Sequence, residues 1–150
     1  MSTPQVSEEE IVRQLATEIR ILESSVTALQ SRLEMVRAAI SEVTLAHDTL
    51  EGLKGLQSGD STLVPVGAGA YVRMTVADSK NHVMVIGAGV AMEKDVGSSV
   101  EELGSRLQDF DKARTAIRQQ LDQTVARYQQ DREALEELLR RRESTATKTR

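Results

Sequence analysis

The fold is decided by residues 61–95, which read STLVPVGAGAYVRMTVADSKNHVMVIGAGVAMEKD. Val66-Gly67-Ala68-Gly69-Ala70 recurs twenty residues later as Ile86-Gly87-Ala88-Gly89-Val90, and valine-rich runs flank both copies. Each Gly-Ala-Gly can form a tight turn because glycine adopts positive φ without steric cost. The repeat therefore predicts two tandem β-hairpins. The four strands are expected at Leu63–Val66, Tyr71–Val76, His82–Ile86 and Val90–Lys94.

This hairpin segment is too small to be stable alone. Four strands in about 35 residues lack a core of their own, and their open edges and apolar face need a partner. Pro65 lacks an N–H donor, which predicts an edge strand or a bulge there. We therefore expect the chain to oligomerise through its hairpins. The expected interface consists of apolar strand residues, namely Val64, Val66, Val72, Met74, Val76, Val83, Val85 and Val90.

The segment before the hairpins has a helical period. Steps of three and four residues from Val12 to Leu50 meet an apolar side chain at every position except His47. This alternation is typical of a coiled-coil seam. Ser7 and Glu10 have the spacing of a capping box near its start. The sequence thus predicts a helix over residues 6–58.

A second seam, from Val100 to Leu138, predicts a helix over residues 98–142, followed by a disordered tail at 143–150. Ser98 and Glu101 have capping-box spacing at its start. Arg114, Thr124 and Asp131 interrupt this seam; we interpret them as residues that set the register, with a specific partner contact as the alternative.

The two seams match each other in antiparallel register. When residues whose numbers sum to 150 are paired, all the layers coincide, and Leu29 for example faces Leu121. We therefore expect one subunit of the α + small β class over residues 1–150. It would be a long antiparallel intramolecular coiled coil, with two tandem β-hairpins at its closed end and both chain ends at its far tip.

The composition excludes several classes of protein. The chain has three aromatic residues and no tryptophan, which argues against a compact globule. It has no cysteine for a disulfide, a thiol nucleophile or a thiolate metal site. A net charge of −4 argues against nucleic acid as the main partner, and no apolar run approaches the roughly 20 residues that span a membrane. The polar, acidic start does not resemble a targeting peptide, so we expect a cytoplasmic protein.

No motif predicts an enzyme or a bound cofactor. The two Gly-Ala-Gly turns lack the third glycine of a dinucleotide fingerprint, since Val72 and Met92 occupy those positions. His47 and His82 have no second histidine or cysteine at ligand spacing, so neither a metal nor a catalytic site is expected. The basic run at residues 140–142 is interpreted as a solvated helix end, with nucleic-acid binding or docking of an acidic partner protein as the alternatives.

The order helix, two Gly-x-Gly hairpins, helix resembles the alpha subunit of archaeal prefoldin. The resemblance depends mostly on Leu63–Gly69 in the first hairpin and on Ile86–Val90, continuing through Asp95, in the second. Beta subunits of that family would have one hairpin, so two favour the alpha class. The resemblance implies a hexamer of two alpha and four beta subunits, joined through a β-barrel platform. It also implies an ATP-independent chaperone that holds unfolded proteins and passes them to a group II chaperonin.

The resemblance places client binding at the tips of the coiled coil. An unfolded client offers apolar side chains without fixed geometry, and several weak apolar contacts made together give useful avidity. The alternative function is a structural coiled-coil adaptor that docks one folded partner, which would not bind unrelated denatured proteins. The candidate client-binding residues are Val6, Ile11, Val12, Leu15, Leu135, Leu138 and Leu139.

Overall fold

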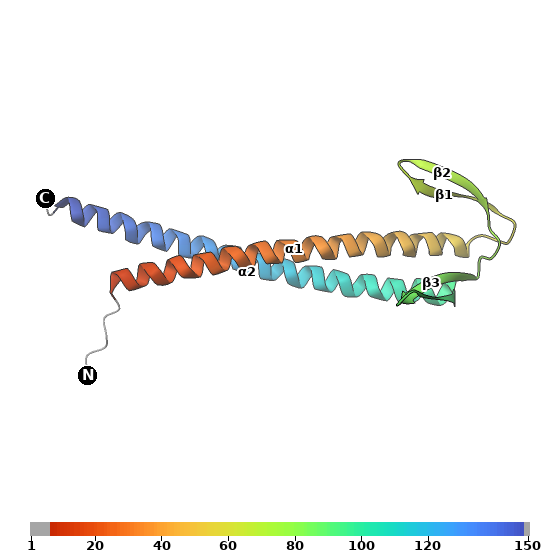
Figure 1. Ribbon diagram of the computed structural model, residues 1–150, viewed down its shortest axis with the longest axis horizontal. Coiled ribbons are helices and arrows are strands. Elements are labelled where there is room, and N and C mark those ends of the chain that lie inside the picture. The colour runs from red at the N-terminus through yellow and green to blue at the C-terminus, as the bar shows by residue number, and fades with distance from the viewer. Residues whose placement is uncertain (1–6, 149–150) are drawn as a thin grey trace, which may run out of the picture. The chain divides into compact units, whose positions relative to one another are not determined.

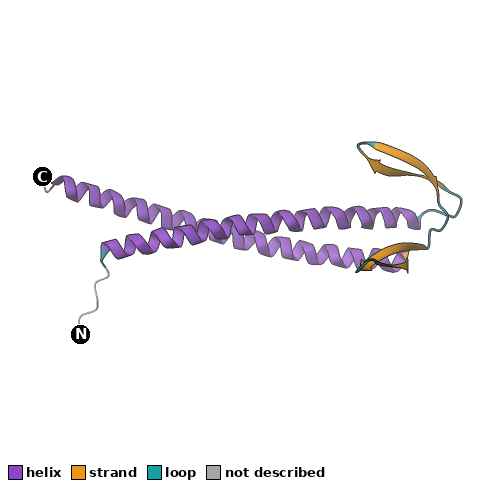
Figure 2. Cartoon of the chain, in the orientation of Figure 1, coloured by secondary structure: helices purple, strands orange, loops and turns teal. Residues whose placement is uncertain are grey.

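Two long helices and two small antiparallel hairpins make up the chain (Figures 1 and 2). The structure, a computed structural model, describes residues 7–148. This architecture confirms the predicted fold class. No helix in residues 7–148 is long and apolar enough to cross a membrane. In chain order the elements are α1 (Glu8–Lys54), β1 (Ser61–Gly67), β2 (Ala70–Thr75), β3 (Asn81–Gly87), β4 (Val90–Asp95) and α2 (Val96–Lys148).

The first helix begins where the capping signal predicted. The Glu10 amide donates to the Ser7 hydroxyl oxygen at 3.3 Å and to the Ser7 carbonyl at 2.9 Å. Three glutamates in the first turn are favourable at the positive end of the helix dipole. The helix ends at Lys54, four residues before the predicted end, between Gly52 and Gly55, which weaken helical structure.

The second helix differs from the prediction at both ends. It begins at Val96, and the residue that caps it is Asp95 rather than Ser98, because the Ser98 amide donates to Asp95 Oδ2 at 2.8 Å. It continues to Lys148, so residues 143–148 are helical and not the disordered tail that was expected. The Ser144 and Thr145 hydroxyls donate to the Arg141 carbonyl, which satisfies their hydrogen bonding within the helix.

Both hairpins close through the repeated Gly-Ala-Gly. The turn residues Ala68 and Gly69 have φ of 50° and 77°, and Ala88 and Gly89 have 48° and 75°. Positive φ at both central residues is the pattern of a type I′ turn, whose twist suits a hairpin. The register shifts between Pro65 and Gly67, so the irregularity that Pro65 predicted is present. The same shift occurs between Val85 and Gly87 in the second hairpin.

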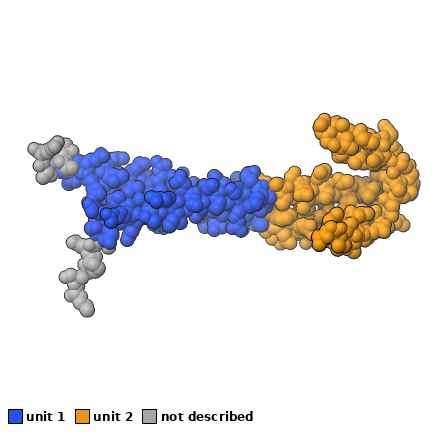
Figure 3. All heavy atoms as spheres, viewed as in Figure 1, with its two compact units in different colours: residues 1–36, 113–150 blue, residues 37–112 orange. Residues whose placement is uncertain are grey.

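The chain forms two compact units, which Figure 3 colours separately. Unit 1 comprises residues 1–36 and 113–150, and unit 2 comprises residues 37–112. In unit 1 the seam side chains are half-buried or buried, and Leu29 and Leu33 are only 6% exposed. Arg114 is the exception, because its side chain is exposed. Within this unit the coiled-coil interface is therefore the one that the sequence predicted.

In unit 2 the core lies between the start of α2 and the end of α1. Val96, Val100 and Leu103 are buried, and Ser99 has no exposed surface. His47 Nε2 lies 3.8 Å from the position that a Cβ on Gly104 would occupy. This places His47 beside the Leu103–Gly104 turn, as the register predicted.

Candidate functional sites: the hairpins and the helix ends

The first hairpin exposes apolar side chains on both of its faces. Val64 and Val72 are paired across the strands on one face, and Leu63 and Tyr71 are on the other. All four are exposed, as are Val66 and Met74. A contiguous apolar surface of this kind is typical of a site that another protein covers.

Exposure alternates along β3 of the second hairpin. Val83 and Val85 are 72% and 71% exposed, whereas His82 and Met84, which alternate with them, are half-buried. Residues 82–85 of β3 line a groove in unit 2 together with Leu45 and Leu50 of α1 and Leu103 of α2. Lys94 of β4 also forms an ion pair with Glu102 of α2, with Nζ and Oε2 2.5 Å apart. The second hairpin therefore packs against both helices within this unit.

The linkers that flank the first hairpin are hydrogen-bonded to each other. The Gly59 amide donates to the Val76 carbonyl at 2.8 Å, and the Val76 amide donates to the Asp60 carbonyl at 2.9 Å. The Ser58 hydroxyl donates to the Ala77 carbonyl at 2.9 Å. These bonds hold the two linkers together and close the base of the first hairpin.

One predicted interface residue has a different environment. Val76 was expected at the end of a strand, but β2 ends at Thr75, and Val76 is buried with 7% exposure inside its own subunit. The other seven predicted interface residues, including Val90, are exposed. The linker bonds at Gly59 and Asp60 explain the difference, and no side-chain pattern predicts them because they are backbone contacts.

At the helix ends in unit 1, the predicted residues differ in exposure. Ile11, Val12 and Leu15 of α1 and Leu135 and Leu138 of α2 are half-buried. Leu139 is 43% exposed, which agrees with its position outside the seam, whereas Ile11 is more covered than that position suggested. Val6 lies outside the described residues.

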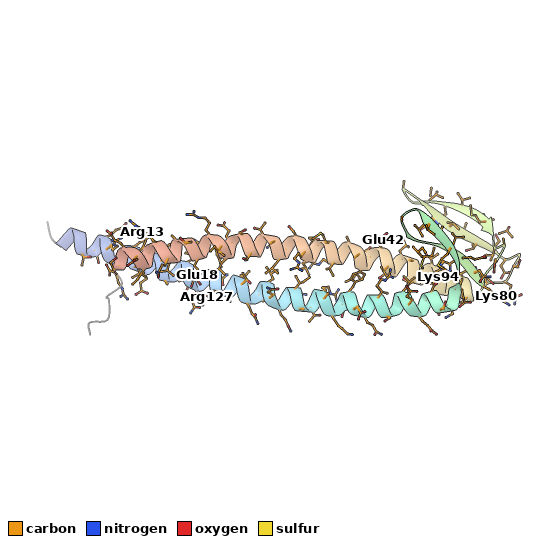
Figure 4. All side chains as sticks on the ribbon, turned by 60° about the horizontal axis from the view of Figure 1, so that its bottom comes forward. Arg13, Glu18, Glu42, Lys80, Lys94 and Arg127 are labelled. Atoms are coloured by element: carbon orange, nitrogen blue, oxygen red, sulfur yellow. The ribbon has the colours of Figure 1, made fainter. Side chains whose placement is uncertain are left out.

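Ion pairs connect the helices at this end of the coiled coil. Arg127 Nη2 of α2 lies 2.8 Å from Glu18 Oε1 of α1, and both residues are labelled in Figure 4. Arg142 Nη2 lies 3.3 Å from Glu9 Oε1. Arg127 also holds Asp131 Oδ1 at 3.1 Å through its Nε. These pairs join α1 and α2 in the antiparallel direction and support the predicted pairing within unit 1.

The sequence interpretation missed three exposed apolar side chains on α1. Ile21, Met35 and Leu45 are each more than 60% exposed and lie outside the seam. Their off-seam positions were a signal that could have identified them, because an apolar residue on the outer face of a coiled coil has no partner helix. Ile21 also lines a shallow surface site with Arg13 and Gln14.

Two carboxylates in unit 2 have clear electrostatic environments. Hydrogen bonds from the Lys80 amide and from Asn81 hold the pKa of Asp78 below its usual value. The Lys94 ammonium likewise lowers the pKa of Glu102 through a charged hydrogen bond. Within residues 7–148 no group of three or more His, Asp or Glu side chains could hold a metal ion. These two carboxylates therefore stabilise local structure. Asp78 orders the linker before β3, and Glu102 binds Lys94 where β4 meets α2.

These features define a class of protein: a coiled-coil subunit that carries two exposed apolar β-hairpins between its helices. A family model described as "Prefoldin subunit" matches residues 22–144, and the chain belongs to the prefoldin family. Its similarity is to alpha subunits, which agrees with the two hairpins.

Curated relatives and a solved structure agree with this assignment. The chain is 33% identical over 110 residues to "Prefoldin subunit alpha" of Methanopyrus kandleri, covering 73% of this chain and 70% of the relative. It is 34% identical over 104 residues to "Prefoldin subunit alpha" of Methanococcoides burtonii, covering 69% and 75%. A chain in the cryo-EM structure of filamentous PFD from Methanocaldococcus jannaschii has a TM-score of 0.59 at 22% identity, covering 76% of this chain and 94% of that one. This structural similarity, at 22% identity, shows a shared fold alone.

Proposed function

We propose that this chain is a subunit of an ATP-independent holdase chaperone. Two such alpha subunits would assemble with four beta subunits through the hairpins, and the complex would bind unfolded proteins in the cytoplasm and pass them to a group II chaperonin. The observation that carries the proposal is the presence of two kinds of apolar surface in one member of the prefoldin family. One kind is the exposed hairpin face, and the other is the partly covered set of leucines at the helix ends.

The helix ends suit a binder of unfolded chains for a physical reason. Their apolar side chains are half-buried, so each offers a small contact area that does not demand one partner geometry. A small contact contributes little free energy alone, but several arms that bind one client raise its effective concentration at the next arm. No nucleotide is needed for binding of this kind, because the free energy comes from apolar burial.

A matched pair of substitutions tests the client site. In the assembled complex, Leu139→Ser together with Ile11→Ser should weaken suppression of aggregation, because both apolar residues lie near the helix ends. Ile21→Ser is the control, since Ile21 is 61% exposed on α1 of the same unit but lies outside the proposed site. The measurement is light scattering of two unrelated denatured proteins without nucleotide, with the mass of the complex checked for each variant.

A truncated chain gives the stronger form of this test. Residues 24–129 retain the hairpins and matched lengths of both helices but lack every proposed client residue. This chain should assemble and yet suppress aggregation poorly. Full activity in a correctly assembled truncated complex would contradict the proposed site, and failure of the intact complex on both test proteins would favour an adaptor for one folded partner.

A further inference from the structure

The second hairpin carries two methionines and a histidine on one face. Met84 of β3 and Met92 of β4 are direct cross-strand partners, and such partners have Cβ atoms about 4.5–5.5 Å apart. His82 lies two residues before Met84 on β3, so its side chain is on the same face of the hairpin. Exposure agrees with this alternation, because His82 and Met84 are half-buried whereas Val83 between them is 72% exposed. The strand pairing therefore brings two thioethers and one imidazole together.

The His82 ring lacks the partners that a buried imidazole normally has. Both ring nitrogens are buried, and neither has a hydrogen-bond partner within residues 7–148. Buried polar atoms are nearly always paired, so these unpaired nitrogens require an explanation. A neutral imidazole has one nitrogen with a free lone pair, which can bind a metal ion. His47 differs, because its Nδ1 lies 3.1 Å from Asp48 Oδ1.

The internal repeat places this cluster in the second hairpin alone. Twenty positions before the two methionines are Val64 and Val72, which are the corresponding cross-strand partners in the first hairpin. Twenty positions before His82 is Thr62. The first hairpin therefore has the same strand register without a thioether or an imidazole at these three positions, so the cluster is not a requirement of the hairpin fold.

The ligand types in this cluster favour a soft metal ion. Thioether sulfur prefers Cu(I) and imidazole also binds copper, whereas Mg²⁺, Ca²⁺ and Mn²⁺ prefer oxygen ligands. Zn²⁺ is bound mainly by thiolate, imidazole and carboxylate groups, of which this cluster offers one imidazole. The chain has no cysteine that could compete for Cu(I). Because all three ligands are neutral, an ion with a single positive charge also costs less to bury than a divalent one.

The charged groups near the cluster are compatible with a bound cation. Lys94 is the cross-strand partner of His82, but its ammonium is already paired with the Glu102 carboxylate of α2. Glu42 of α1 lines the same groove of about 460 Å³ as His82 and Met84, and Figure 4 labels Glu42 and Lys94. The Glu42 carboxylate thus supplies negative charge in the groove that the cluster faces.

We propose that the second hairpin binds one Cu(I) ion through a ring nitrogen of His82 and the sulfur atoms of Met84 and Met92. The ion joins β3 to β4 and therefore holds the two strands together. Met92 is 44% exposed, which gives the ion access from solvent to the half-buried ligands on β3. Histidine and cysteine spacing did not predict a metal, because these ligands meet only through strand pairing. This inference concerns the single chain and does not rest on the proposed chaperone function.

Methionine methyl signals can report binding in the full-length chain. Ag(I) is the probe, because it has the ligand preference of Cu(I) and is stable in air. With ¹³C-methyl methionine, equimolar Ag(I) should shift the Met84 and Met92 resonances together with the His82 ring signals. The Met74 and Met35 resonances should stay unchanged, although both side chains are more exposed than Met92. This comparison separates a built site from binding to any accessible thioether.

Three substitutions and one control assign the ligands. Met84→Leu and Met92→Leu each keep an apolar side chain of similar size but remove the sulfur. His82→Phe keeps a flat ring without nitrogen. In anaerobic competition with the Cu(I) chelator ferrozine, each should weaken Cu(I) binding by about tenfold or more, since loss of a group that supports a metal ligand already costs about that much. Met74→Leu is the matched control and should retain the wild-type affinity, and circular dichroism checks the fold of every variant.

Several outcomes would overturn the proposal. Equal Ag(I) shifts of Met35, Met74 and Met92 would show binding to exposed thioethers without a site. An affinity for Cu(I) that is the same in Met84→Leu and Met92→Leu as in Met74→Leu would exclude the thioethers as ligands. If a variant loses its fold, the wild-type methyl and ring signals still decide, because a titration that leaves Met84 or His82 unshifted contradicts the proposed ligand set.

Discussion

The alanine in each hairpin turn adopts a backbone conformation that its side chain disfavours. Ala68 and Ala88 have φ near 50°, in the left-handed region, where a Cβ costs roughly 1–2 kcal/mol. Asparagine is preferred at the first central position of a type I′ turn because its short polar side chain tolerates this region. The alanines thus make each hairpin less stable than its turn geometry allows.

Replacing both alanines should stabilise the hairpins. Ala68→Asn and Ala88→Asn should each raise the stability of their hairpin by about 0.5–1 kcal/mol, since they relieve the left-handed strain. Hydrogen exchange of the β1–β4 amides measures the effect. Ala77→Asn is the control, because Ala77 is exposed and lacks a positive φ. Equal protection in the double variant and the wild type would show that strand pairing and not turn strain limits hairpin stability.

A single buried carboxylate interrupts the seam of unit 1. Asp131 is 5% exposed, its Oδ1 is bound by Arg127, and its Oδ2 has no hydrogen-bond partner in the described part of the chain. Burial of a charge with an incomplete set of partners costs free energy that the ion pair does not fully return. Asp131 is therefore expected to weaken this layer of the coiled coil while it fixes the position of Arg127.

Leucine at this position should strengthen the helix pair. Asp131→Leu should raise the free energy of unfolding by about 1–3 kcal/mol, because an apolar side chain suits the seam better than a partly paired carboxylate. Urea denaturation followed by circular dichroism measures the change, and Gln130→Leu at an exposed neighbouring position is the control. Destabilisation by Asp131→Leu would show that the Arg127 network contributes more than the desolvation of Asp131 costs.

At the scale of elements, the linker between the hairpins depends on one aspartate. Asp78 Oδ1 accepts from the Lys80 amide at 2.7 Å and from the Asn81 amide at 3.2 Å, and Oδ2 accepts from the Asn81 side chain at 3.0 Å. The next contact is the Val96 amide, which donates to the Lys80 carbonyl at 2.7 Å and joins the linker to the start of α2. Asp78 thus orders the segment that leads into the second hairpin.

Acid should loosen this linker. Because the bonds from Lys80 and Asn81 lower the pKa of Asp78, the order that it contributes is complete above the usual value of 3.8 and is lost as pH falls through the lowered pKa of the folded state. Exchange protection of the Lys80 and Asn81 amides should therefore be retained at pH 5 and decrease below pH 3.8. Asp78→Ala should lack protection at both pH values, and a wild type whose protection decreases well above pH 4 would contradict this assignment.

The elements themselves could be predicted from local signals. The three-and-four alternation from Val12 to Leu50 identifies the side chains that are covered in α1, and each Gly-Ala-Gly identifies a turn. The cap of α2 could not be chosen in this way, because Asp95, Ser98 and Ser99 all have capping side chains and the Val96–Lys80 bond favours the earliest start. The burial of Val76 could not be predicted either, because it depends on backbone hydrogen bonds between linkers that are distant in sequence.

At the scale of the whole molecule, the predicted client site is less visible in sequence than the hairpin surface. The hairpins expose apolar side chains that alternate along a strand, and such a pattern leaves few explanations other than a protein partner. A leucine near a helix end, such as Leu138, fits a coiled-coil seam and a client contact equally well. Aggregation assays of an assembled complex that lacks the helix ends separate these two roles.

Exposure in the single chain distinguishes interface residues of the hairpins from core residues. Val83→Asp or Val72→Asp should leave the subunit folded, because both side chains are exposed in the single chain, at 72% and 43%. In a complex that covers them, each would bury an unpaired carboxylate, so assembly should fail. Val96→Asp is the opposite case: Val96 is 1% exposed inside unit 2, and the substitution should unfold the hairpin–helix core before assembly is possible. Native mass spectrometry and circular dichroism of each variant, mixed with a beta-type partner, distinguish a folded subunit that cannot assemble from a chain that has lost its fold. A Val83→Asp chain that forms the full complex would place the interface elsewhere on the surface.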